Sequence, residues 1–198
     1  MKKLNAKGFT LIELLAVITI MGILMMVAIP TVSRTIENSR KDTFIDTMKS
    51  YINGAKNMWA ADNLRCKAAT GTGDFLSSAV PTGTYYINVD SSDIDSHPVL
   101  LEQGGKSSWG SREIKGYIKV VVEDKTLGSD EITRAITYYP VLTDGIHGVN
   151  INPATTSTEA AASALTAGEK LDRGKIKMSG AGYPTLKADG SAGLCWEV

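Results

Sequence analysis

A run of apolar residues near the N-terminus constrains this chain most strongly. From Phe9 to Ser33 the only ionisable side chain is Glu13. At about 1.5 Å of rise per residue, a helix over 9–30 is roughly 30 Å long, which matches the hydrocarbon core of a bilayer. The run is preceded by Lys2, Lys3 and Lys7. The positive-inside rule therefore predicts a single membrane crossing with the N-terminus in the cytoplasm.

Two simpler interpretations of the run leave something unexplained. A secretory signal peptide would end in a small-x-small cleavage site, and the nearest candidate, Thr31-Val32-Ser33, is a poor one. A plain anchor accounts for the length and the lysines, but an acid inside a bilayer segment costs about 2.5 to 3.5 kcal/mol on insertion scales. Glu13 therefore needs a partner.

The residues around this acid resemble a known processing signal. The stretch Lys7-Gly8-Phe9-Thr10-Leu11-Ile12-Glu13 is similar to the cleavage site of type IV prepilins and related pseudopilins. The resemblance implies a leader over residues 1–8, removed after Gly8 by a membrane prepilin peptidase that also N-methylates Phe9. It further implies that Glu13 of one subunit pairs with the new α-amino group of a neighbour in a filament. Gly22 and Pro30 lie where the long helix of this family commonly has a glycine and a kinking proline.

The new amine bears on Glu13 in the unassembled subunit as well. An α-amino group at Phe9 is mostly cationic at neutral pH, and it lies one helical turn from Glu13. We expect the two groups of one chain to satisfy each other in part before assembly. Pairing between subunits then sets the register of the filament, because a desolvated acid is compensated only by such a partner.

Beyond Pro30 the pattern changes from uniformly apolar to amphipathic. Apolar residues at three-and-four spacing predict a helix that continues to about Ala61 and packs one face on a folded domain. This face is predicted to comprise Val32, Ile36, Phe44, Ile45, Met48, Ile52, Ala55 and Trp59. The expected organisation is a leader at 1–8, an apolar assembly helix at 9–30, an amphipathic half at 31–61 and a head domain at 62–198.

The head domain has the pattern of a small antiparallel sheet. Alternating or apolar β-forming runs predict strands at 85–89, 116–123, 131–142, 146–151 and 174–178. Pro140 favours an edge or the end of a strand. Thr156 and Glu159 form a capping-box pattern that predicts a short surface helix. We therefore expect an α+β fold, and the resemblance implies its type IV pilin-like form, with a long N-terminal helix packed on an antiparallel sheet.

The two cysteines favour a disulfide over a zinc site. Cys66 and Cys195 are too few and too far apart for paired Cys-x-x-Cys ligands. Disulfides persist outside the cytosol, where the predicted topology places the head domain. Members of the resembled family often close a C-terminal loop in this way. On the chain-entropy scale, a loop of this size contributes about 4 to 5 kcal/mol.

The sequence offers little for catalysis or cofactor binding. His97 and His147 stand in no zinc-protease spacing, and we interpret Asp144 and His147 as a turn aspartate and a surface histidine. The acidic stretch 90–95 lacks the glycine and final glutamate of a calcium-binding loop. The formal charge is zero, with 21 basic and 21 acidic side chains, and no basic block suggests nucleic acid. We expect neither an enzyme, nor a metal, nor a cofactor.

The expected function is structural. The resemblance implies a pilin that polymerises with itself and other pilins into an extracellular filament, after a period as a precursor in the lipid of the cytoplasmic membrane. The implied partners are the prepilin peptidase and a membrane assembly platform. Loss of the leader removes three lysines and leaves 18 basic against 21 acidic side chains, or −3. The alternatives are a pseudopilin of a type II secretion or competence system and, less in keeping with the residues, a membrane-anchored enzyme or binding protein.

Overall fold

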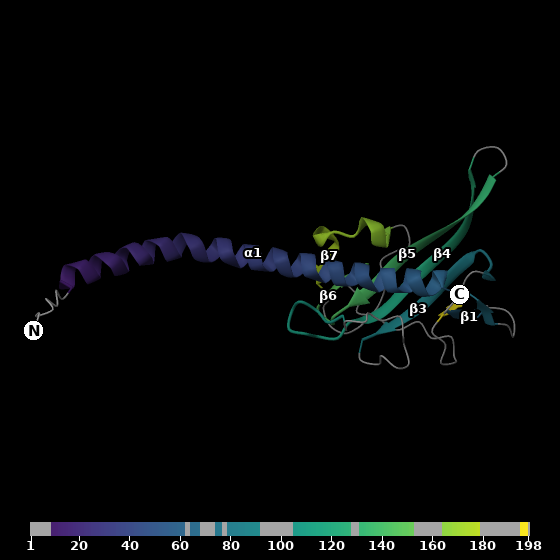
Figure 1. Cartoon of the computed structure of the whole chain (residues 1–198), viewed down its shortest axis with the longest axis horizontal. Helices are drawn as coiled ribbons and strands as arrows, with labels where there is room; N and C mark the ends of the chain where they lie inside the picture. Colours follow the sequence, from purple (N-terminus) through teal and green to yellow (C-terminus); the bar gives the residue numbers. More distant parts are fainter. Residues whose placement is uncertain are drawn as a thin grey trace, which may run out of the picture. The chain divides into compact units, whose positions relative to one another are not determined.

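The structure, a computed structural model, describes 9–61, 64–67, 74–76, 79–91, 105–127, 131–152, 164–178 and 195–197. The chain divides into two compact units, of which the first ends at Ser39 and the second begins at Arg40. Helix α1 (Leu11–Ala60) is continuous from one unit into the next (Figure 1). The predicted helix, Phe9 to Ala61, is confirmed to within two residues at each end.

In the second unit, helix α1 buries one face against the sheet. The predicted residues from Phe44 to Trp59 are all buried, and Tyr51, which the prediction did not include, is buried with them. Val32 and Ile36 were expected to begin this face, and that expectation was wrong. Their side chains are 55% and 49% exposed, because the buried face begins only at Phe44.

Within the described residues, eight strands form one sheet in the order β2-β1-β8-β3-β4-β5-β6-β7. All neighbouring pairs are antiparallel except β1 and β8, which are parallel. The strands are β1 (Arg65–Lys67), β2 (Asp74–Leu76), β3 (Gly83–Asp90), β4 (Lys115–Leu127), β5 (Glu131–Thr143), β6 (His147–Val149), β7 (Ile176–Met178) and β8 (Cys195–Glu197). Two short 3-10 helices, η3 (Gly168–Lys170) and η4 (Arg173–Lys175), precede β7.

The predicted antiparallel sheet is confirmed in β3 to β7, which follow one another in both sequence and space and so form a meander. The short strands β1, β2 and β8, of three residues each, were not predicted. Pro140 pairs with Ile118 of β4, while β6 pairs with β5 only at Leu142 and Thr143. Pro140 therefore lies beyond the β6 pairing, where a missing backbone donor is tolerated.

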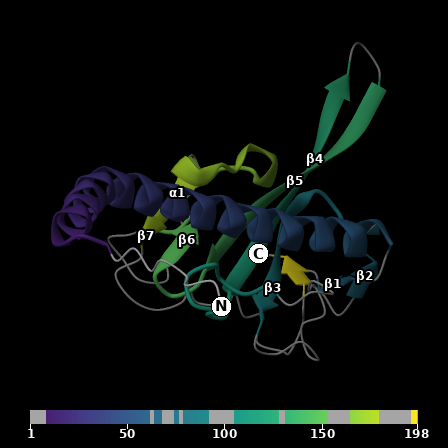
Figure 2. The same ribbon diagram turned by 60° about the vertical axis from the view of Figure 1, so that its left-hand side comes forward.

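The core lies between helix α1 and one face of the sheet (Figure 2). Alternate residues of β3 and β4 point into it, including Ile87 of β3 and Val120 of β4. A smaller apolar cluster on the other sheet face contains Tyr86, Tyr117, Val141 and Ile151, with Leu165 packed against it. This arrangement is the α+β, type IV pilin-like architecture that the sequence predicts. The capping box at Thr156 and Glu159 lies outside the described residues.

Candidate functional site

The start of helix α1 is closed by a reciprocal pair of side chains. Thr10, the residue before the helix, donates both its backbone N–H and its hydroxyl to Oε2 of Glu13, each at 2.8 Å. The backbone N–H of Glu13 in turn donates to Oγ1 of Thr10 at 3.4 Å. This is a capping box, which satisfies the free donors of the first helical turn. Glu13 therefore has a partner within its own chain.

Thr10 is a functional residue that the sequence analysis missed. The signal was present, because Thr10-x-x-Glu13 before an apolar run has the same form as the pattern recognised at Thr156 and Glu159. The expected intrachain partner was instead the amine at Phe9. In the uncleaved chain the Phe9 nitrogen is an amide, and the carboxylate of Glu13 is bound by Thr10.

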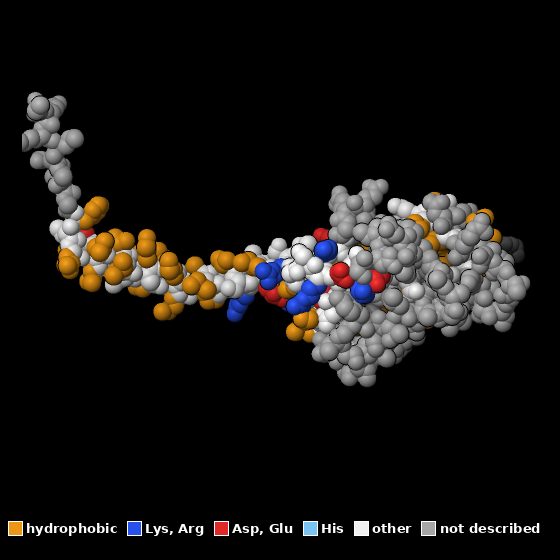
Figure 3. Space-filling view, turned by 90° about the horizontal axis from the view of Figure 1, so that it is seen from below, with side chains coloured by type: hydrophobic (Ala, Val, Ile, Leu, Met, Phe, Trp, Pro, Cys, Tyr) orange, Lys and Arg blue, Asp and Glu red, His pale blue; other side chains and the backbone are white. Residues whose placement is uncertain are grey.

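In the first unit, the large apolar side chains of helix α1 are exposed, and Figure 3 shows many of them on the face in view. None of the most apolar window of this helix is buried within the molecule. Soluble monomers rarely expose contiguous apolar patches larger than a few hundred Å², so this surface requires lipid or other protein. Among the described residues, α1 is the helix whose length and composition allow it to cross a membrane.

Gly22 and Pro30 both lie inside the continuous helix α1. A Cβ added to Gly22 would meet nothing within 4 Å, so its role does not rest on close packing inside the subunit. Pro30 has no backbone N–H and cannot donate to the carbonyl four residues before it. The hydroxyl of the next residue, Thr31, donates to the carbonyl of Val27 at 3.2 Å and adds a bond in this turn. The helix remains intact across both residues.

A disulfide joins Cys66 and Cys195, the pair named from the sequence. The two residues are direct partners in the parallel pair of β1 and β8, with Cα atoms 4.5 Å apart. Both are fully buried in the main core. The bond thus attaches the C-terminal strand to the segment that follows the long helix.

Asp144 lies in the turn between β5 and β6, as expected, but the expectation that His147 lies on the surface was wrong. The Asp144 side chain is fully buried and that of His147 is 14% exposed. Asp144 accepts hydrogen bonds from the backbone N–H groups of Ile146 and His147, at 2.9 and 2.6 Å, and from the hydroxyl of Ser107. Burial acts to raise the pKa of Asp144, but the hydrogen bond from Ser107 and those from the backbone outweigh it and hold the pKa below its usual value.

Ser107, Asp144 and His147 have the residue types of a catalytic triad but not its order. In a hydrolase triad the imidazole lies between the serine and the acid, and it takes the proton of the serine. Here the carboxylate lies between the other two, because Oδ2 of Asp144 accepts from Ser107 and lies 3.4 Å from Nδ1 of His147. The serine is consequently held by an acid rather than activated by a base.

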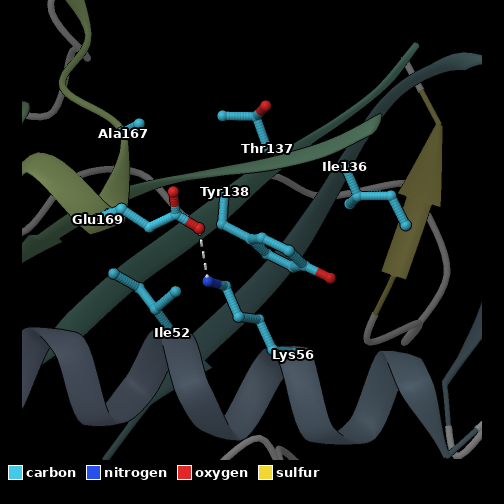
Figure 4. Close-up of a pocket in the computed structure, with 8 residues that line it drawn as sticks. Ile52, Lys56, Ile136, Thr137, Tyr138, Ala167 and Glu169 are labelled. Atoms are coloured by element: carbon cyan, nitrogen blue, oxygen red, sulfur yellow. Dashed lines mark hydrogen bonds and ion pairs between the residues drawn. The ribbon is translucent and has the colours of Figure 1, made fainter. Parts of the chain in front are cut away.

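A small pocket of the second unit lies beside helix α1. The pocket in Figure 4 lies between helix α1, strand β5 and the segment around η3, with a volume of about 40 Å³. Across it, Nζ of Lys56 forms an ion pair with Glu169 at 3.0 Å and lies 5.6 Å from the centre of the Tyr138 ring. A space of this size accommodates water rather than a cofactor.

Groups of side chains able to hold a metal are absent from the described part of the chain. Within the acidic stretch 90–95, only Asp90 and Ser91 are described. Asp90 forms an ion pair with Lys115 at 3.1 Å. Asp93 and Asp95 lie outside the described residues.

Comparison with known families identifies the N-terminal segment. Residues 3–29 match the family model described as "Prokaryotic N-terminal methylation motif". The chain therefore carries the prepilin-type cleavage and methylation motif, and the resemblance seen at Lys7 to Glu13 is confirmed. Searches of curated proteins and of solved structures returned no match.

The motif, which covers only the N-terminal part of the chain, supports a precursor of the type IV pilin or pseudopilin kind. The motif marks structural proteins rather than enzymes, and it implies processing by prepilin peptidase and polymerisation into pili or pseudopili. The apolar helix near the N-terminus fits a membrane-anchored precursor.

Proposed function

We propose that this chain is a structural subunit of a type IV pilus. The observation that carries the proposal is the exposed apolar half of helix α1, which directly follows the methylation motif. A surface of this kind is stable in two settings, namely a bilayer and the core of a helical polymer built from the same helices. The same residues serve as an anchor in the precursor and as the packing surface in the filament.

Processing divides the chain at Gly8. The peptidase removes residues 1–8, and methylation of Phe9 follows. The lysines of the leader keep the N-terminus of the precursor in the cytoplasm, and the head domain lies on the far side of the membrane. Residues 9–30 span the bilayer, 31–61 continue the helix, and 62–198 form the head that is exposed on the finished filament.

Glu13 exchanges partners during assembly. In the precursor, the Thr10 capping box offsets part of the cost of an acid in the bilayer. After cleavage the α-amino group of Phe9 is available, and its charge makes it a stronger partner than a hydroxyl. An incoming subunit presents this group to Glu13 of a neighbour on the growing filament. Gly22 and Pro30 leave the intervening helix able to adapt its local geometry.

A pseudopilin of a type II secretion or competence system carries the same motif and remains the alternative. The disulfide between Cys66 and Cys195 supports the pilus, because members of that family often close the C-terminal part of the head in this way. Adhesion or twitching motility would follow from an exposed filament. Electron microscopy of sheared surface filaments labelled for this chain separates the two functions, since a pseudopilus remains a short periplasmic structure.

Glu13→Ala and Glu13→Gln test the assembly mechanism in the native host. Asp46→Ala is the matched control, because Asp46 is an exposed acid on the same helix. We expect all three variants to be inserted and cleaved, with intact masses that begin at Phe9 plus one methyl group. Only the wild type and Asp46→Ala should yield filaments. Normal filaments from Glu13→Ala would refute the pairing, and a mass beginning at Met1 in cells with active peptidase would refute the processing.

A further inference from the structure

The 105–114 loop holds helix α1 where the helix enters the second unit. The hydroxyl of Ser108 donates to the backbone carbonyl of Arg40 at 2.7 Å, and the phenol of Tyr51 donates to the carbonyl of Gly105 at 2.7 Å. Between these bonds, the rings of Phe44 and Trp109 pack with centroids 5.3 Å apart. At 100° per residue, positions 40, 44 and 51 lie within about 40° of one another on the helix. The loop therefore follows one face of α1.

The other side of the same loop is attached to the turn between β5 and β6. Ser107 donates its hydroxyl to the buried carboxylate of Asp144. The Trp109 ring stacks on the imidazole of His147, with centroids 3.8 Å apart and planes inclined by 14°. The backbone N–H of Trp109 donates to Oγ of Ser107 at 3.1 Å, which couples these two contacts. Residues 107–109 thus contact both the helix and the turn.

Bonds within the loop make it behave as one piece. The N–H of Ser107 donates to the carbonyl of Arg112 at 2.8 Å, and the N–H of Ser111 donates to the carbonyl of Ser107 at 3.2 Å. Gly110 and Ser111 have positive φ angles of 88° and 55°, a backbone conformation that residues other than glycine rarely adopt. The turn is therefore fixed by its own hydrogen bonds, and a displacement at Ser107 also moves Ser108 and Trp109.

We propose that the 105–114 loop is a latch for the first turns of helix α1 in the head, and that Asp144 locks this latch. With Asp144 in place, the loop keeps residues 40–48 of the helix on the sheet. Without its carboxylate, the loop separates from the β5–β6 turn, and residues 40–48 detach while residues 52–60 stay packed. The device belongs to the single subunit and does not depend on the function proposed above.

Asp144→Asn is the appropriate change because it keeps the size of the side chain and one acceptor. The amide oxygen can still accept from the backbone N–H groups of Ile146 and His147. The amide nitrogen, however, replaces the oxygen that accepts from Ser107, so the charge-assisted bond is lost and only a weaker neutral bond from the amide to Oγ of Ser107 can replace it. Asp172→Asn is the matched control, since Asp172 also accepts a backbone N–H, from Gly174 at 2.7 Å, but is exposed.

Hydrogen exchange measured by mass spectrometry on the full chain in detergent micelles tests the latch. In Asp144→Asn, peptides covering 40–48 and 105–114 should exchange about ten-fold faster, the factor that corresponds to one buried hydrogen bond. Peptides from 52–60, β3 and β4 should exchange as in the wild type, and Asp172→Asn should change none of these. Unchanged exchange at 40–48 would overturn the proposal, and so would equal acceleration throughout the head.

Two serine variants keep the proposal testable if Asp144→Asn does not fold. Ser107→Ala removes the donor to Asp144 and should accelerate exchange in both 40–48 and 105–114. Ser108→Ala removes only the bond to the carbonyl of Arg40 and should accelerate exchange at the start of this helix segment while leaving the β5–β6 turn protected. If Ser107→Ala left 40–48 as protected as in the wild type, the loop would not act as a latch.

Discussion

Loss of the disulfide is the perturbation with the largest expected effect on the head domain. Cys66 and Cys195 are separated by 129 positions, and the chain-entropy model gives about 5 kcal/mol for closing a loop of that length. The free energy of unfolding of a domain is about 5 to 15 kcal/mol, so the bond accounts for a large share of it. We expect the double variant Cys66→Ser with Cys195→Ser to lose about 3 to 5 kcal/mol of unfolding free energy.

The position of β8 determines which strands open first when the disulfide is absent. β8 pairs with β3 on one side and with β1 on the other. Within the described residues, β1 pairs only with β8 and β2, so the β1–β2 hairpin reaches the rest of the sheet through β8. Strands of three residues are marginal on their own. Without the disulfide, β1, β2 and β8 should open before the meander of β3 to β7 does.

Hydrogen exchange on the oxidised wild type, the reduced wild type and the double variant in detergent micelles measures this order. Peptides containing β1 and β8 should lose protection in the two forms without the bond, while β4 and β5 retain most of theirs. Lys125→Ser, an exposed substitution in β4, is the control and should leave β8 unchanged. Full protection of β8 without the bond, or an equal loss in every strand, would refute the reasoning.

Three further changes test the packing and charge of the head. Gly168→Ala places a Cβ against Cδ1 of Ile52 and should lower the free energy of unfolding, measured in urea, by about 1 to 3 kcal/mol. Ile52→Val removes this Cδ1 and should restore part of the loss. A neutral effect of Gly168→Ala would contradict the close approach. Because its pKa is lowered on folding, Asp144 should stabilise the head above about pH 4, its unfolded range, and lose that contribution as the pH falls through the folded pKa. Stability curves of wild type and Asp144→Asn should converge in acid, and parallel curves would disprove this linkage. Glu169→Ala should change stability by under about 1 kcal/mol, because its ion pair with Lys56 is exposed, and a larger loss in the same assay would show that the pair is more than a surface contact.

Local patterns in the sequence predicted much of the fold correctly. The three-and-four spacing from Phe44 to Trp59 identified the buried face of helix α1 correctly, and β-forming runs located the five strands of the meander. The helix and strands β3, β4 and β5 are each long enough to repeat their own period several times. Tyr51 also fits the three-and-four spacing but was left out of the prediction; in the structure its hydroxyl donates to the carbonyl of Gly105.

The candidate site also has a part that the sequence can predict and a part that it cannot. The processing segment from Lys7 to Glu13 is contiguous, so its chemistry is visible in the sequence, and the Thr10 capping box is local enough to have been read there. The cluster of Ser107, Asp144 and His147 is not contiguous. Its members come from a loop and from a turn that follows β5, and only the pairing of β4 with β5 brings these two regions together.

The sequence alone carried the methylation motif that implies processing by prepilin peptidase, because this motif is a short contiguous segment that is recognisable without tertiary structure. It also determined that a long helix carries one apolar half and one amphipathic half. Only the tertiary structure decided where the C-terminal strand is inserted, which residues satisfy the buried carboxylate of Asp144, and where the helix first becomes attached to the head. These features depend on contacts between residues far apart in the chain, and the energy of such contacts depends on packing that local sequence does not encode.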